Sequence, residues 1–65
     1  MKKIGNLIKE RRKVLHITQQ ELADLAGISV NTVVAVERGQ GDPKISTYTS
    51  ICNVLGLNLI VSLKN

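Results

Sequence analysis

Two helix starts, each with its own cap, stand close together between Thr18 and Gly39, and they constrain this chain more than any other feature. Thr18 is a favourable N-cap residue, and Glu21 three positions later completes a capping box. Ser29 is the N-cap of a second helix. Gly27 can take the positive φ that ends the first helix sharply. Because so few residues separate the two helices, they must cross steeply.

This stretch resembles the helix-turn-helix of the Cro/repressor superfamily, also called XRE-type regulators. The similarity extends upstream to Ile8 and downstream to Leu57. The resemblance implies a mostly α, four-helix, repressor-like domain that binds DNA, and we treat residues 1–65 as that single domain. The matching residues are Thr18, Gln19, Glu21, Leu22 and Ala23, then Ala26 to Ser29, Thr32 and Val33, and Val36 to Gly39.

Apolar residues at helical spacing predict helices over about 2–15, 19–26, 30–38 and 45–55. His16 tolerates left-handed backbone in the first turn, and Gly56 is expected to end the fourth helix. Gly5 lies inside the first helix, where glycine costs about 1 kcal/mol relative to alanine. The predicted inward stripes contain Ile4, Leu7, Ile8, Leu15, Leu22, Leu25, Ala26, Val33, Val36, Ile45, Tyr48, Ile51, Cys52 and Leu55.

The tail over 57–63 alternates apolar and polar side chains, which predicts a short C-terminal β-strand. Since nothing else in the sequence indicates a strand, we expect it to pair with the same strand of a second subunit. Such a tail is similar to that of HipB-type antitoxin repressors. The expected homodimer interface contains Leu57, Leu59, Ile60, Val61 and Leu63.

Composition agrees with a nucleic-acid partner. The 65 residues carry a net charge of +4, and six of the nine basic residues fall at or before Lys13. The lone Cys52 excludes an internal disulfide and favours a reducing, cytoplasmic location. We expect no secretory signal, no membrane span, no metal and no cofactor.

The second helix of such a motif inserts its first turns into the major groove. Asn31 can bond adenine through two hydrogen bonds, and valine methyl groups can contact thymine methyl groups, so we expect an A·T-leaning half-site. The predicted base-reading residues are Ser29, Val30, Asn31, Thr32, Val34 and Ala35. The predicted phosphate-binding residues are Gln19, which the resemblance implies, and Arg38, Gln40 and Lys44 around the following loop.

The resemblance also implies a structural ion pair between Arg12 and Glu37, linking the first helix to the third. A two-fold dimer would set two reading helices about 34 Å apart and require a near-palindromic operator. The favoured function is a homodimeric transcriptional repressor that binds double-stranded DNA.

The alternative is an antitoxin, which would neutralise a toxin and repress its own operon. We reject an enzyme, because one His, one Cys and five scattered acidic residues provide no catalytic pair, triad or metal-binding spacing.

Overall fold

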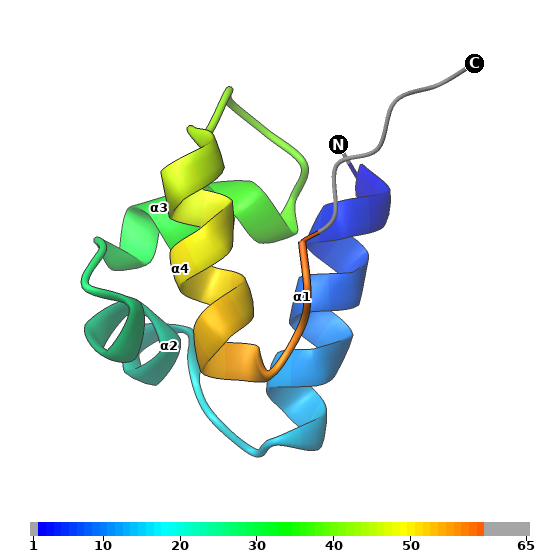
Figure 1. Ribbon diagram of the computed structural model, residues 1–65, viewed down its shortest axis with the longest axis vertical. Helices are drawn as coiled ribbons and strands as arrows, with labels where there is room; N and C mark the ends of the chain where they lie inside the picture. The colour runs from blue at the N-terminus through cyan, green and yellow to red at the C-terminus, as the bar shows by residue number, and fades with distance from the viewer. Residues whose placement is uncertain (1, 60–65) are drawn as a thin grey trace.

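The computed structural model describes residues 2–59, with Lys2 described by its backbone alone. It contains four helices, α1 (Lys2–Val14), α2 (Gln19–Ala26), α3 (Val30–Glu37) and α4 (Ile45–Leu55). Figure 1 shows α4 between α1 on one side and α2 with α3 on the other. The first and third helices end one residue earlier than the sequence pattern predicts, and the other two have the predicted bounds.

A small aliphatic core holds the four helices together. Each helix contributes at least one fully enclosed side chain, and helices as short as these depend on such packing for most of their stability. The buried apolar residues are Ile8, Leu22, Ala23, Val33, Val36, Ile51, Cys52 and Leu55.

All four helices end with the same C-terminal capping motif. A residue with positive φ follows each helix, and the next backbone N–H donates to a carbonyl oxygen five residues earlier, as in a Schellman motif. At the end of α1 this position is His16, with φ of 58°. The closing bonds run from Ile17 to Arg12, Ile28 to Ala23, Gln40 to Ala35 and Leu57 to Cys52, at 2.9–3.3 Å.

The predicted C-terminal β-strand is wrong. Residues 57–59 belong to no strand, and the described part of the chain contains none. Gly56 takes the left-handed conformation, and the Leu57 N–H donates to the Cys52 carbonyl at 2.9 Å, so the first residue of the predicted strand serves the end of α4. A strand also needs a ladder partner, and the four helices offer none. Ile60, Val61 and Leu63 of the predicted interface lie outside the described residues.

Several residues of the predicted inward stripes are instead exposed, namely Leu7, Leu15, Leu25 and Ile45. In α1 the side that packs against the other helices is rotated about the helix axis relative to the predicted apolar stripe. Helix α1 packs through Gly5, Ile8 and Arg12, which places Leu7 at the edge with 55% of its surface exposed.

The backbones of α1 and α3 approach closely at Gly5. A Cβ atom at this position would lie 2.8 Å from the Glu37 carbonyl oxygen and would also clash with the Val36 carbonyl. The glycine that weakens α1 as an isolated helix is therefore what allows its backbone to lie against the end of α3.

Candidate nucleic-acid interface

Helix α3 is anchored at its start by its own cap. The Ser29 side chain accepts a hydrogen bond from the Thr32 N–H at 3.2 Å. The Ser29 and Thr32 hydroxyl groups also share a hydrogen bond of 2.9 Å. These two predicted base readers are thus bonded to each other, and together they offer a neighbour less hydrogen-bonding capacity than two free hydroxyls would.

The other predicted base readers differ in exposure. Asn31 is exposed at the start of α3, with its carboxamide available to a partner. Val34 and Ala35 are half-buried. Val30 is also half-buried, but it packs against the core, so part of its methyl surface serves the fold.

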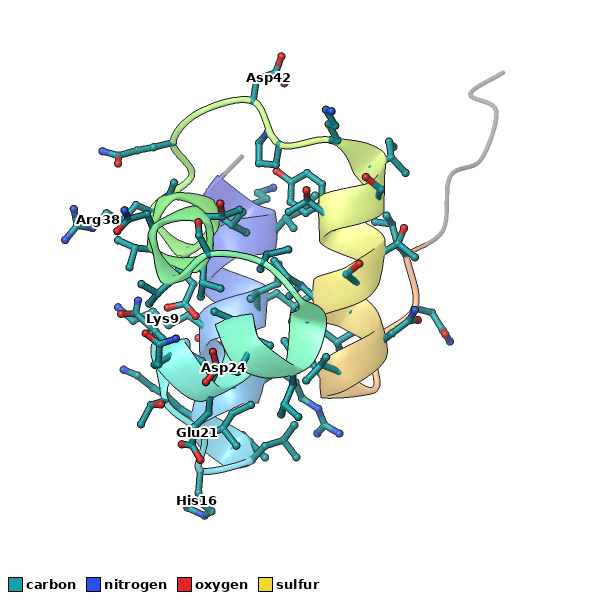
Figure 2. The ribbon with its side chains drawn as sticks, turned by 90° about the vertical axis from the view of Figure 1, so that its left-hand side faces the viewer. Lys9, His16, Glu21, Asp24, Arg38 and Asp42 are labelled. Carbon is teal, nitrogen blue, oxygen red and sulfur yellow. The ribbon has the colours of Figure 1, made fainter. Side chains whose placement is uncertain are left out.

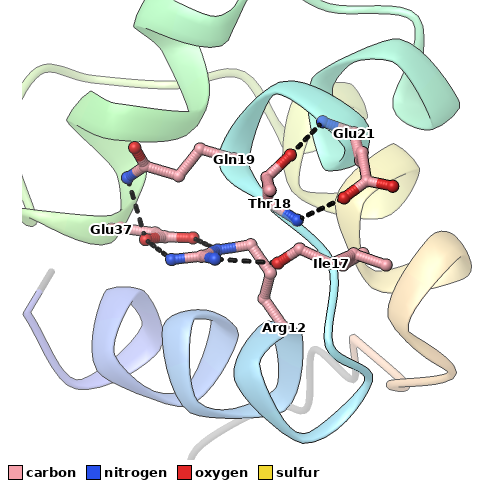
Figure 3. A network of polar contacts seen from close by, with 6 residues as sticks. All are labelled: Arg12, Ile17, Thr18, Gln19, Glu21 and Glu37. Carbon is pink, nitrogen blue, oxygen red and sulfur yellow. Dashed lines mark hydrogen bonds and ion pairs between the residues drawn. The ribbon is translucent and has the colours of Figure 1, made fainter.

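The opposite end of α3 is fixed by a buried carboxylate. Arg12 donates to Glu37 through Nε at 2.6 Å and through a terminal nitrogen at 3.1 Å, so the ion pair implied by the resemblance is present in the structure. Glu37 also accepts from Gln19 Nε2 at 3.2 Å, and Arg12 donates to the Ile17 carbonyl at 2.9 Å. Figure 3 shows this network joining α1, α2 and α3 around one side chain.

The geometry of this ion pair favours the charged form of Arg12. The hydrogen bond that Arg12 donates to Glu37 raises the pKa of Arg12. Partial burial acts to lower this pKa, and the negative charge of Glu37 acts to raise it. The guanidinium therefore stays protonated wherever the protein is folded. Because 97% of the Glu37 side chain is shielded from solvent, an unpaired charge there would be strongly unfavourable.

The predicted phosphate-binding residues surround α3. Arg38, Gln40 and Lys44 are exposed in the segment that follows α3, while Gln19 is half-buried at the start of α2. One N–H of the Gln19 carboxamide donates to Glu37, and an amide group carries a second N–H that can donate to a phosphate. Gln19 is thus oriented by the same carboxylate that fixes α3.

Acidic side chains border the surface that carries the predicted phosphate-binding residues. Figure 2 shows Glu21 and Asp24 on the outer side of α2 and Asp42 at the far end of the molecule, whereas Arg38 projects from a different edge. Glu21 completes the Thr18 capping box and Asp24 accepts from Gln20 Nε2 at 2.9 Å, so both carboxylates are engaged within α2. Phosphates would be repelled from that side of α2 and attracted to the edge with Arg38.

Two contacts escaped the sequence reasoning. Arg11 Nε donates to the Leu55 carbonyl at 2.9 Å, which links α1 to the end of α4. Gln19 donates to Glu37, where we expected only a phosphate ligand. The helical wheel places Arg11 and Arg12 on or beside the apolar stripe and predicts a buried partner for at least one of them, but it does not show that the partner of Arg11 is a backbone carbonyl.

No group of three or more His, Cys, Asp or Glu side chains that could hold a metal occurs within residues 2–59. Over the same residues, no helix has the length and apolar character needed to cross a membrane.

The arrangement of α2 and α3 is that of a helix-turn-helix, and comparison with known proteins agrees. A sequence model of the family described as Helix-turn-helix matches residues 8–61. The chain belongs to the XRE-type helix-turn-helix family. This confirms the resemblance seen in the sequence and makes the chain a DNA-binding protein of the transcriptional-regulator class.

Relatives of this XRE-type chain carry compatible names. An uncharacterized HTH-type transcriptional regulator of Methanothermobacter thermautotrophicus is 40% identical over 50 residues, covering 77% of this chain and 72% of that protein. The ImmF control region 10 kDa protein of Bacillus phage phi105 is 37% identical over 60 residues, covering 92% and 67%. The immunity repressor protein of the same phage is 32% identical over 56 residues, covering 86% and 39%. None of these names points to the HipB-type branch.

Proposed function

We propose that this protein is a transcriptional repressor that binds a near-palindromic operator as a homodimer and acts without catalysis. The observation that carries the proposal is the contrast within α3, whose first turn exposes Asn31 while its last turn is locked by Glu37. A reading helix needs this combination, since side chains can find base edges only if the helix is held rigidly. The repressor names among the phage relatives support the regulatory role.

Asn31 is the principal base reader in this proposal. Its carboxamide matches the adenine N6 and N7 positions in the major groove. Val34 and Ala35 supply methyl surface for thymine, with a smaller part from Val30. The bonded hydroxyls of Ser29 and Thr32 act as one polar group and add little discrimination. The half-site should therefore be A·T-rich and read partly through DNA shape.

Backbone phosphates would bind on both sides of α3. Gln19 serves one side, and Arg38, Gln40 and Lys44 serve the other. Because each such contact releases counterions, affinity should fall steeply as salt is raised. A protein working on operators in this way acts in the cytoplasm.

Two copies are needed because one α3 offers a single strong base reader. A two-fold dimer places two such helices one helical turn of DNA apart, about 34 Å, and so doubles the number of base-reading side chains. The tail strand predicted as the contact is wrong, and the antitoxin alternative loses with it the feature that favoured it. We therefore do not propose a toxin partner, and we retain the dimer only because a single α3 offers one strong base reader.

The test is selection of bound duplexes from a random library, followed by measurements on single variants. We expect near-palindromic, A·T-rich sites with half-sites about 10 base pairs apart. Asn31→Ala should lower affinity for the selected site by about 1–3 kcal/mol and relax the preference at one adenine. Asn53→Ala, an exposed asparagine of α4, is the matched control and should bind normally. Enrichment of no sequence would refute the proposal, and an unaltered Asn31→Ala variant would remove Asn31 from its role.

A further inference from the structure

A second basic surface lies outside the helix-turn-helix, on the exposed side of α1. Lys9 and Lys13 are one helical turn apart, and both are exposed. Together with Asn6 and Glu10 they line a shallow hollow of about 340 Å³. Within the described residues, neither lysine side chain forms an ion pair or a hydrogen bond. We call these four residues the α1 face.

The contacts of α1 place this face beside the end of α3. Lys9 comes four residues after Gly5 and three before Arg12, so the three share one side of the helix. Gly5 lies against the Glu37 carbonyl and Arg12 is paired with the Glu37 carboxylate. Lys9 is therefore held next to the helix end from which Arg38 projects, and Figure 2 shows both side chains toward the same edge of the molecule.

Stability does not account for the lysine at position 9. Lys13 falls in the last turn of α1, where a positive charge is favoured by the helix dipole, but Lys9 lies in the middle of the helix. The Lys9 side chain is exposed and forms no ion pair with the described residues. Glu10 offsets one of the two lysine charges, which leaves a net charge of +1 over the hollow and a further positive charge at Arg38 nearby.

We propose that the α1 face binds the phosphodiester backbone of the operator outside the half-site read by α3. The inference rests on the proposed function and extends its footprint. Charge complementarity and continuity with the surface around Arg38 argue for DNA as the occupant. Lys9 and Lys13 would each neutralise a flanking phosphate, Asn6 would donate to a phosphate oxygen, and Glu10 would limit the affinity.

The experiment compares two duplexes with the folded, full-length protein. One duplex is trimmed to the selected operator, and the other carries the same operator with about ten flanking base pairs on each side, roughly one helical turn. Binding is measured over a range of salt concentrations. The wild-type protein should bind the flanked duplex several-fold more tightly and with a steeper salt dependence.

Single variants assign that gain to the α1 face. Lys9→Gln and Lys13→Gln should each bind the flanked duplex about threefold more weakly, with a salt slope lower by about one, and bind the trimmed duplex normally. Glu10→Gln should bind the flanked duplex more tightly. Lys3→Gln changes an exposed lysine in the first turn of α1 that does not line the hollow, so it has the same net charge as the lysine variants and should behave like the wild type. A general loss of folding cannot produce opposite signs at Lys9 and Glu10.

The outcomes separate the two proposals. If the wild-type protein binds neither duplex, the proposed function fails. If it binds both duplexes equally, or if Lys9→Gln and Lys3→Gln behave alike, the operator is bound but the α1 face has another occupant, such as an acidic protein, and this inference is wrong.

Discussion

Helices α3 and α4 both have low intrinsic helix propensity, and they are stabilised by different kinds of contact. Both are poor in strong helix formers, because α3 is rich in valine and the first half of α4 is rich in serine and threonine. Helix α3 is held by polar contacts at both ends, from the Ser29 cap to the Glu37 carboxylate. The cap of α4, Lys44, makes no side-chain hydrogen bond, and its three buried residues, Ile51, Cys52 and Leu55, all lie in its second half.

The difference follows from what each helix must expose. The first turn of α3 exposes Asn31 on one side while Val30 and Val33 pack inward on the other, and the hydrogen bonds of the Ser29 cap add to this packing. Helix α4 can bury a continuous apolar side, so its second half is stabilised by packing and its first turn is left weak. The surface that we propose to read DNA is thus held by hydrogen bonds at both ends of α3.

The largest effect should come from removing the carboxylate that fixes α3. Glu37→Ala leaves the partly buried Arg12 charge without its negative partner, so we expect the free energy of unfolding to fall by about 3 kcal/mol, measured by urea denaturation. Glu10→Ala, an exposed glutamate of α1, is the control and should change stability by less than about 0.5 kcal/mol. Equal stability in the two variants would mean that polar anchoring of α3 contributes nothing.

Gly5→Ala tests the close approach that accompanies this anchor. Alanine is the better helix former by about 1 kcal/mol, but its Cβ would clash with two carbonyl oxygens at the end of α3. Since backbone must move to relieve the clash, we expect a net loss of about 2 kcal/mol in thermal or urea unfolding. Asn6→Ala, at the next and exposed position, is the control. A stabilised Gly5→Ala protein would show that the two helices can separate freely.

Exchanging cap chemistry sharpens the comparison between α3 and α4. Ser29→Ala should cost about 1 kcal/mol, because it removes a cap that is in use. Lys44→Ser should gain up to about 1 kcal/mol, because the Lys44 backbone already has the extended N-cap conformation and lacks only an oxygen acceptor. Both are measured as unfolding free energies without DNA. Opposite signs are expected, and a loss at Lys44 would mean that its side chain already supports α4.

The smallest effect concerns the core of α4. Burial raises the pKa of the Cys52 thiol, so as the pH rises the thiol of the unfolded chain ionises before that of the folded chain. The unfolded state then binds fewer protons, and the free energy of unfolding should decrease above the ordinary cysteine pKa of about 8.5. Cys52→Ala should show a shallower decrease over the same range. An identical slope in both proteins would place the thiol in contact with water.

The sequence determined the parts of the fold that depend on neighbouring residues. The Thr18 and Ser29 caps, the left-handed residues at His16, Gly27 and Gly56, and the bounds of α2 and α4 are as expected, because caps and turns act within a few bonds of the backbone. The family and its DNA-binding role were also readable from the sequence.

Only the tertiary structure decided which surfaces are buried and what each polar group bonds. Periodicity places Leu7 and Leu25 on inward stripes, but the packing of α1 through Gly5 and the placement of α2 leave both exposed. The tail pattern predicts a strand, yet the backbone of Leu57 closes α4. Gln19 bonds Glu37 across eighteen residues of sequence. The burial of a side chain and its hydrogen-bond partners depend on which helices pack together, and the local sequence pattern alone does not specify that packing.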